Sequence, residues 1–176
     1  MSEVFIEHNI KDLQRALDTL PKEVTMRVLK QVAQTAERET LRRFRRSSRT
    51  WRHQPDFQVI QEVTPTSIEL LVGTDDKVYG YVDRGTRPHW IAPRKPGYPL
   101  RFRSGYKAKT VPGVLNSGPG GAFGGWVRAM RVWHPGTRAR GFSRMIFQEI
   151  GPMMRQKTLE LIDKAIKRHF RVWGRG

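Results

Sequence analysis

The spacing of apolar residues predicts two helices in the first 46 residues. Behind Asn9, a residue that favours the helix N-cap, apolar side chains recur at helical spacing and predict a short helix over about 10–20. A second helix is expected over about 22–46, because Pro21 stands in the first turn, where proline is tolerated. Its apolar stripe is wide enough to pack on a sheet or another helix and comprises Val24, Val28, Leu29, Val32, Ala33, Ala36, Leu41 and Phe44.

Strict alternation then predicts a β-hairpin over about 57–73. Apolar residues alternate through 57–63, residues 64–67 read as a turn, and Ile68, Leu70 and Val72 alternate in the returning strand. Glycine and the pair of aspartates that follow should end the hairpin. The next segment, 78–82, fits either a third strand or a helical turn.

The middle of the chain predicts a long arm. A short strand is expected over Leu100–Arg103 and a returning strand over Trp126–Trp133. Between them, residues 113–125 read GVLNSGPGGAFGG, which is too glycine-rich to be rigid alone. A loop of this length is normally functional or disordered. We therefore expect Leu100–Trp133 to project from the body of the protein.

The C-terminal part is expected to be helical. Residues 142–150 should form a first piece, and Gly151-Pro152 should kink or interrupt it because proline lacks a backbone donor. A main helix over about 152–171 would follow, with an apolar face made of Leu159, Leu161, Ile162, Ala165, Ile166 and Phe170. The predicted fold is α+β: one domain over 1–176 with a small antiparallel sheet packed against N-terminal and C-terminal helices, and a projecting β-arm.

Charge changes this picture, because the net charge is +17 and most of it lies in one stretch. Residues 84–148 hold thirteen Lys and Arg and no Asp or Glu. Such a block predicts attraction to polyanions, although a solvated basic surface would have the same composition. No apolar run approaches the roughly 18 residues of a membrane span.

A second basic cluster ends the long N-terminal helix, interleaved with Phe44 and Trp51. Cations at a helix C-terminus are favoured by the helix dipole, which would explain part of it. Arginine beside aromatic residues also suits contact with phosphate, so both interpretations stay open. The residues expected to contact DNA or an acidic partner are Arg42, Arg43, Arg45, Arg46, Arg49 and Arg52.

Catalytic motifs of the GxSxG, Walker A and HExxH types do not occur, and there is no cysteine. His89 and His134 sit in similar contexts and could meet in space, either as a metal pair or each bonded to the main chain. Asp75, Asp76 and Asp83 could hold a divalent ion, or could serve in turns and caps. We expect no enzymatic activity, no cofactor and no metal.

Two short motifs echo each other: GTRPH at 85–89 and HPGTR at 134–138. In each, glycine should occupy a tight turn, proline should stiffen the corner, and threonine should bond its own turn backbone. The residues expected in these corners are Gly85, Thr86, Pro88, Pro135, Gly136 and Thr137. Arg87 and Arg138 are expected to pair with Asp83 or with an acidic group on another subunit.

These motifs resemble those of a known family. YGYVDRGTRPH at 79–89 is similar to the signature Tyr-Ala-x-Tyr-Val-Glu-x-Gly-Thr-Arg of the small neck, or tail-completion, proteins of long-tailed bacteriophages. VWHPGT at 132–137, followed by RGF at 140–142, is similar to the second signature, His-Pro-Gly-Thr-x-Ala-x-Pro-Phe. The order of elements also matches over about 10–170. Here Gly80, Asp83 and Gly141 replace the usual Ala, Glu and Pro.

The resemblance implies a structural virion protein for head–tail joining, assembled in the bacterial host cytoplasm. Such proteins form a homo-oligomeric ring, commonly a hexamer, between the head connector or stopper and the tail terminator, with genomic DNA in the channel. We expect the arm to act as an intersubunit clasp. Its expected interface residues are Arg101, Phe102, Arg103, Tyr106, Lys107, Trp126, Arg128 and Arg131. Some of the basic residues of 42–52 or 94–109 would face DNA or an acidic neighbouring ring. The alternatives are a free basic nucleic-acid-binding protein and a small basic nuclease or toxin.

Overall fold

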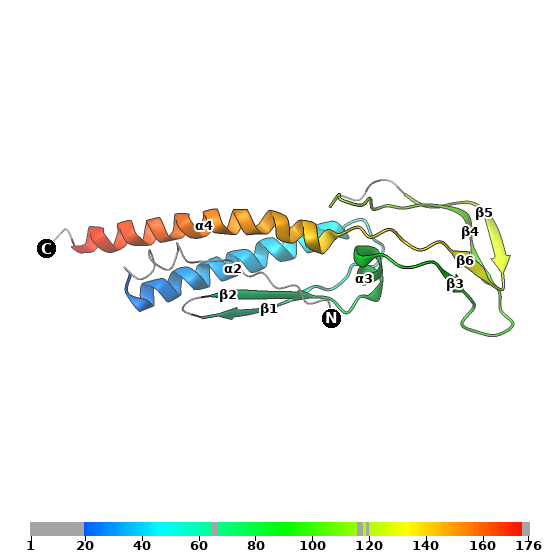
Figure 1. Cartoon of the computed structure of the whole chain (residues 1–176), viewed down its shortest axis with the longest axis horizontal. Coiled ribbons are helices and arrows are strands. Elements are labelled where there is room, and N and C mark those ends of the chain that lie inside the picture. The colour runs from blue at the N-terminus through cyan, green and yellow to red at the C-terminus, as the bar shows by residue number, and fades with distance from the viewer. Residues whose placement is uncertain (1–19, 65–66, 116–117, 119, 174–176) are drawn as a thin grey trace. The chain divides into compact units, whose positions relative to one another are not determined.

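The computed structural model describes residues 20–64, 67–115, 118 and 120–173, and these residues form an α+β fold (Figure 1). The expected helix over 10–20 lies almost wholly outside them. Chain contacts divide the protein into two compact units. The first, here called the helical unit, comprises the described residues of 20–44, 57–74 and 144–173. The second, here called the ribbon unit, comprises Arg45–Asp56 and Asp75–Ser143.

The helical unit contains the two long helices and the hairpin. Helix α2 (Lys22–Ser47) and strands β1 (Gln58–Val63) and β2 (Ile68–Gly73) confirm the predicted helix and hairpin. The two strands pair antiparallel from Gln58 opposite Gly73 to Val63 opposite Ile68. The buried apolar side chains described in this unit are Leu20, Val28, Leu29, Val32, Ala33, Ala36, Phe44, Phe57, Leu70, Val72, Ile146, Ile150, Met154 and Ile162.

Helix α4 (Phe142–Trp173) is continuous, so the predicted interruption at Gly151-Pro152 is wrong. Pro152 is exposed, and the helix survives the loss of one backbone donor because a buried stripe runs along its other side. This stripe recurs every four residues and consists of Phe142, Ile146, Ile150, Met154, Thr158 and Ile162. The predicted apolar face is only partly confirmed, because Ile162 is buried but Leu159 is half exposed.

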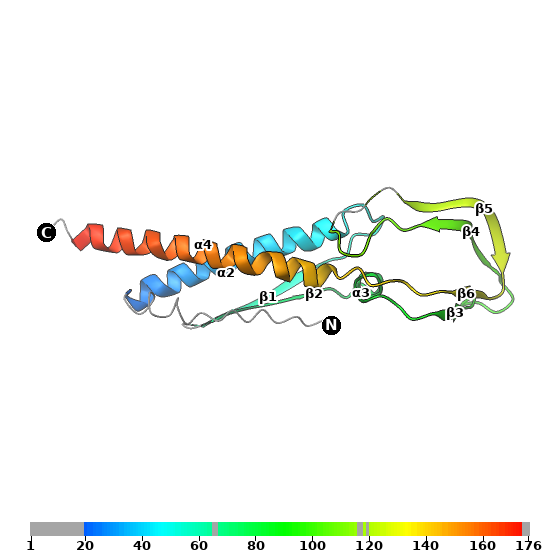
Figure 2. The same ribbon diagram turned by 45° about the horizontal axis from the view of Figure 1, so that its top comes forward.

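The ribbon unit contains one short helix and two antiparallel ladders. The ambiguous segment after the hairpin is helix α3 (Lys77–Arg84), whose N-cap is Asp76 and whose C-cap is Gly85. The strands are β3 (His89–Ile91), β4 (Leu100–Lys107), β5 (Gly121–Ala129) and β6 (Val132–His134). Figure 2 shows β3 paired with β6 and β4 paired with β5.

The arm segment differs from its prediction in three ways. The outgoing strand extends to Lys107 rather than stopping at Arg103. The glycine-rich stretch is partly ordered as strand, because β5 begins at Gly121. The predicted strand over Trp126–Trp133 is two strands, since Met130 and Arg131 interrupt it and β6 then pairs with β3 instead of β4. Within the described residues, no helix is both long and apolar enough to cross a membrane.

Candidate functional site

The two echoing motifs lie against each other, antiparallel. The main-chain N–H of Thr86 donates to the carbonyl of Thr137 at 2.9 Å, and the N–H of Thr137 donates back at 3.2 Å. The Oγ1 of Thr86 also accepts from the N–H of Thr137 at 3.0 Å. Three residues further along each strand, His89 faces His134 in the same register. The two threonines therefore bond each other, rather than their own turns as predicted. The antiparallel contact between residues 85–91 and 132–138 is here called the threonine crossing.

Gly85 and Gly136 allow the two strands to approach this closely. Both have positive φ values, 78° and 88°, which confirms the prediction of turn positions that a side chain would strain. A Cβ on Gly85 would lie 2.6 Å from the carbonyl oxygen of Thr137, and a Cβ on Gly136 would lie 2.4 Å from that of Thr86. Each motif thus supplies the glycine that accommodates the threonine of the other.

Histidine and tryptophan pairs extend the crossing. The rings of His89 and His134 lie 5.1 Å apart, and those of Trp90 and Trp133 also lie 5.1 Å apart. Nδ1 of His89 lies 2.8 Å from the carbonyl oxygen of Arg87, and Nδ1 of His134 accepts from the N–H of Gly136 at 3.0 Å, which confirms the main-chain role predicted for both histidines. Within the described residues, no group of three or more acidic or histidine side chains could hold a metal ion.

Trp90 and Trp133 remain 52% and 51% exposed although their rings contact each other edge to face. The guanidinium of Arg131, one of the predicted interface residues, lies 4.2 Å from the centre of the Trp90 ring. Sequence reasoning missed these tryptophans, although the echo continues one residue further, as His89-Trp90 and Trp133-His134. Exposed aromatic rings beside arginine are typical of interface centres.

Asp83 fixes the start of α4. Its Oδ1 accepts from the N–H of Ser143 at 3.2 Å and its Oδ2 accepts from the hydroxyl of Ser143 at 2.6 Å. A carboxylate there satisfies an otherwise unpaired N–H in the first turn and complements the helix dipole. Arg87 and Arg138 do not pair with Asp83, because neither guanidinium contacts an acidic group in the part of the chain that the structure describes. Their alternative pairing with an acidic group on another subunit stays a prediction. Asp76 caps α3 by accepting from the N–H of Tyr79 at 2.9 Å, so both aspartates are caps.

Tyr79 anchors the core of the ribbon unit. Its ring contacts those of Trp51 and Phe142, and its hydroxyl lies 3.0 Å from the hydroxyl of Ser47. Burial raises the pKa of Tyr79 well above its ordinary value; the hydrogen bond to Ser47 opposes this rise and the charge of Asp83 adds to it. Tyr79 is therefore a neutral structural residue at physiological pH.

The ladder of β4 and β5 presents most of the predicted arm residues. Arg101 pairs with Arg128 and Arg103 pairs with Trp126, so these four side chains share one face. Both Arg101 and Arg103 stack on Trp126, with guanidinium carbons 4.4 Å from the ring centre. Phe102 is half-buried on the other face, opposite Val127, whereas Tyr106 and Lys107 are exposed beyond a register shift at Arg103/Gly105.

The loop that joins these two strands is bonded back to its own unit. The N–H of Gly113 donates to the carbonyl of Arg140 at 3.2 Å, and Nε of Arg140 donates to the hydroxyl of Thr110 at 3.0 Å. Nζ of Lys109 reaches the carbonyl of Thr50 at 3.4 Å. The arm is thus braced at its roots by the threonine crossing and at its far end by these three bonds.

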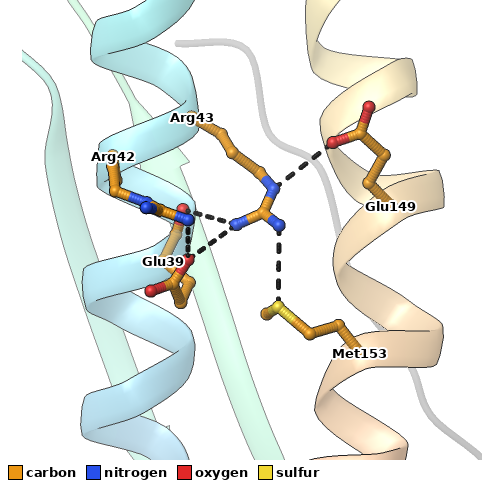
Figure 3. A network of polar contacts seen from close by, with 5 residues as sticks. All are labelled: Glu39, Arg42, Arg43, Glu149 and Met153. Carbon is orange, nitrogen blue, oxygen red and sulfur yellow. Dashed lines mark hydrogen bonds and ion pairs between the residues drawn. The ribbon is translucent and has the colours of Figure 1, made fainter.

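The arginine cluster at the end of α2 divides into two kinds. Arg43 is largely buried between α2 and α4, where it contacts Glu39 at 2.9 Å, Glu149 at 3.4 Å and the sulfur of Met153 at 3.6 Å (Figure 3). This internal role makes it a poor candidate for the predicted contact with DNA. Burial would raise the pKa of Glu39, but Arg43 and Arg42 hold it below its ordinary value. The exposed members of the cluster are Arg42, Arg45, Arg46, Arg49 and Arg52.

Comparison with known proteins gives no relative: no family model, no curated protein and no solved structure matches this chain. The features that bear on function are therefore the two motifs and the geometry of the ribbon unit. This unit holds 17 Lys and Arg against 4 Asp and Glu, a net +13 of the chain's +17. It combines braced strands, exposed aromatic rings and cations, which are groups suited to binding a protein or polyanion.

Proposed function

We propose that this chain is a non-enzymatic structural subunit that assembles with copies of itself into a ring at the head–tail junction of a bacteriophage. The observation that carries the assembly role is the exposed aromatic and arginine surface of the ribbon unit. Trp90, Trp126 and Trp133 are all more than half exposed and lie on hydrogen-bonded strands. Aromatic rings left in water cost free energy that burial against a partner would recover.

The placement at the head–tail junction is supported by the two motifs and their order. The motifs that resemble the neck-protein signatures form the crossing that braces the surface, with reciprocal glycine and threonine contacts. The residues in this crossing hydrogen-bond to main-chain groups, which suits a scaffold. The strongly basic ribbon unit also fits a position near a DNA channel or an acidic neighbouring ring.

Electron microscopy and mass photometry of the purified full-length chain test this proposal. We expect closed rings of a single stoichiometry, and labelling in intact particles should place the protein at the neck. A chain that stays monomeric over a wide concentration range, or that turns over a substrate, would contradict the proposal.

The second candidate is a free nucleic-acid-binding protein. It is favoured by the stacked arginines on Trp126 and by the thirteen basic residues of 84–148 without a carboxylate. An isolated monomer that binds duplex DNA, with affinity falling steeply as salt rises, would support this candidate over the ring.

A further inference from the structure

We propose that the outer face of the β1–β2 hairpin of one copy binds the cationic face of the β4–β5 ladder of the next copy. Glu62 and Glu69 would supply the acidic side of this contact. Arg101, Arg103 and Arg128 would supply the basic side. The inference rests on the proposed self-assembly and names its contacting residues.

The acidic side contains an unfavourable pair. Glu62 and Glu69 are direct partners across the hairpin and both side chains are exposed. Like charges directly opposite each other on a two-stranded sheet are destabilising. No Lys or Arg occurs in Phe57–Thr74 to offset them, and within the described residues neither carboxylate takes part in an ion pair. A cation from outside the hairpin, such as one supplied by a second copy, would relieve the repulsion.

An apolar side chain lies on the same face of the hairpin. Ile60 precedes Glu62 by two residues, so both point to the same side, and Ile60 is 64% exposed. Its cross-strand partner, Leu71, is also not fully buried. The outer face of the hairpin therefore places one exposed isoleucine beside two carboxylates, so a partner could bury an apolar side chain and pair with both charges at the same place.

The basic side has the complementary composition. Arg101, Arg103 and Arg128 surround the exposed Trp126 on one face of the ladder. Stacking on the indole holds the guanidiniums of Arg101 and Arg103 in place, and Arg103 also donates to the carbonyl of Gly124 at 2.9 Å. Their remaining N–H groups are preorganised for carboxylates, so less side-chain entropy is lost on binding.

Two arguments favour a second copy over a nucleic acid as the partner. The chain itself carries both surfaces, each a two-stranded ribbon with charges beside an exposed apolar side chain. A nucleic acid on the cationic face would leave the Glu62–Glu69 repulsion without relief. Because the two surfaces differ, the contact is heterologous, and repetition of a heterologous contact closes a ring when the rotation allows it.

Reversing the charges of either face in the full-length chain tests the contact. In Glu62→Lys/Glu69→Lys, or in Arg101→Glu/Arg103→Glu, like charges would meet, and we expect the apparent dissociation constant for self-association to rise at least about tenfold. Matched controls with the same change in net charge are Glu160→Lys/Asp163→Lys and Arg155→Glu/Arg168→Glu, all at exposed or partly exposed positions of α4 in the helical unit. The controls should associate like the natural chain.

Mixing the two reversed variants gives the sharpest result. Each alone should stay dissociated, whereas an equimolar mixture should assemble with alternating copies, because every interface again joins opposite charges. Mixing could not restore a contact that each chain makes within itself, so recovery would identify a contact between copies.

If the natural chain forms rings that the reversals leave unchanged, this inference fails and the proposed function stands. If the natural chain never associates, both fail. If Arg101→Glu/Arg103→Glu abolishes salt-sensitive DNA binding by a monomer without affecting association, the cationic face binds nucleic acid and the inference is overturned.

Discussion

Thr86 and Thr137 exchange both of their main-chain hydrogen bonds, at 2.9 and 3.2 Å, although 51 residues separate them. This pair sets the register for the whole crossing. In this register, each proline, histidine and tryptophan of one motif lies opposite the same residue type in the other motif. Each glycine lies opposite an arginine of the other motif. The two motifs are one structural unit, which explains why they repeat the same residue types in reverse order.

Gly136→Ala should destabilise this unit strongly. The new Cβ would meet the carbonyl oxygen of Thr86 at 2.4 Å, and a left-handed φ of 88° adds strain. We expect a loss of about 2–4 kcal/mol in the free energy of unfolding, measured in urea.

The matched control for this substitution is Gly97→Ala. Gly97 has a similar φ of 82°, but a Cβ there meets no atom within 4 Å. Gly97→Ala should lower the free energy of unfolding only by the strain of a left-handed φ, about 1–2 kcal/mol. Equal losses for the two variants would show that close approach at the crossing contributes nothing.

Asp83→Ala should weaken the start of α4. The substitution removes both bonds to Ser143 and the negative charge at the helix N-terminus, so we expect a loss of about 1–2 kcal/mol in unfolding free energy. Asp83→Asn should lose less, because its amide oxygen can still accept one bond. Asp75→Asn, at an exposed position between β2 and α3, serves as the control and should change the stability little. An Asp83→Ala protein as stable as this control would argue against the capping role.

The parts of the fold that local patterns determine were predictable. The period of apolar residues in α2 and the alternation in β1 and β2 gave elements whose ends lie within a residue or two of the observed ones. The glycines at 85 and 136 were assigned correctly because positive φ has a strong residue preference. The continuous α4 was missed because a buried stripe on one side outweighs one missing donor at Pro152.

The candidate site was less predictable, because its partners are distant in sequence. Nothing local to Asp83 indicates that it reaches Ser143 instead of a nearby arginine. The pairing of β6 with β3 likewise depends on the contact between Thr86 and Thr137, which is distant in sequence. The alternation over 126–133 therefore predicted one strand where the structure has two. Arg43 looked like its exposed neighbours because only the packing of α4 against α2 buries it.

Thr40→Val should raise the stability of the helical unit. Thr40 is fully buried, and its hydroxyl has no hydrogen-bond partner in the described part of the chain. Replacing an unpaired buried hydroxyl by a methyl group should gain about 1 kcal/mol. The control is Thr158→Val, since the buried Thr158 hydroxyl donates to the carbonyl of Met154 at 2.7 Å and its loss should bring no gain. Thermal and urea unfolding measure both, and a larger benefit at Thr158 would contradict the argument.

The Glu39 network predicts a stability change in acid. Burial would raise the pKa of Glu39, but hydrogen bonds and charge from Arg43 and Arg42 lower it below the ordinary value of 4.5. A carboxyl group with a lowered folded-state pKa stabilises the protein above 4.5, and this stabilisation is lost as the pH falls through the folded value. Glu39→Gln should therefore lower the free energy of unfolding at pH 7 by no more than about 1 kcal/mol, because the carboxylate is partly exposed. The loss should be smaller at pH 3, where the natural carboxylate is more protonated. A difference between variant and natural chain that does not change with pH would count against this network.

Deleting Lys107–Gly125 should abolish ring formation. The deletion leaves only the four rungs from Leu100 opposite Ala129 to Arg103 opposite Trp126, and it removes the bonds that tie the loop to Thr50 and Arg140. A two-stranded ribbon this short is marginal by itself, so the arginines on it would no longer be held for a partner. Mass photometry should show monomers, and a complementation assay should show loss of virion assembly. Circular dichroism should retain the helical signal of α2 and α4, which lie outside the deleted segment. Normal rings and a normal titre would mean that the arm is dispensable.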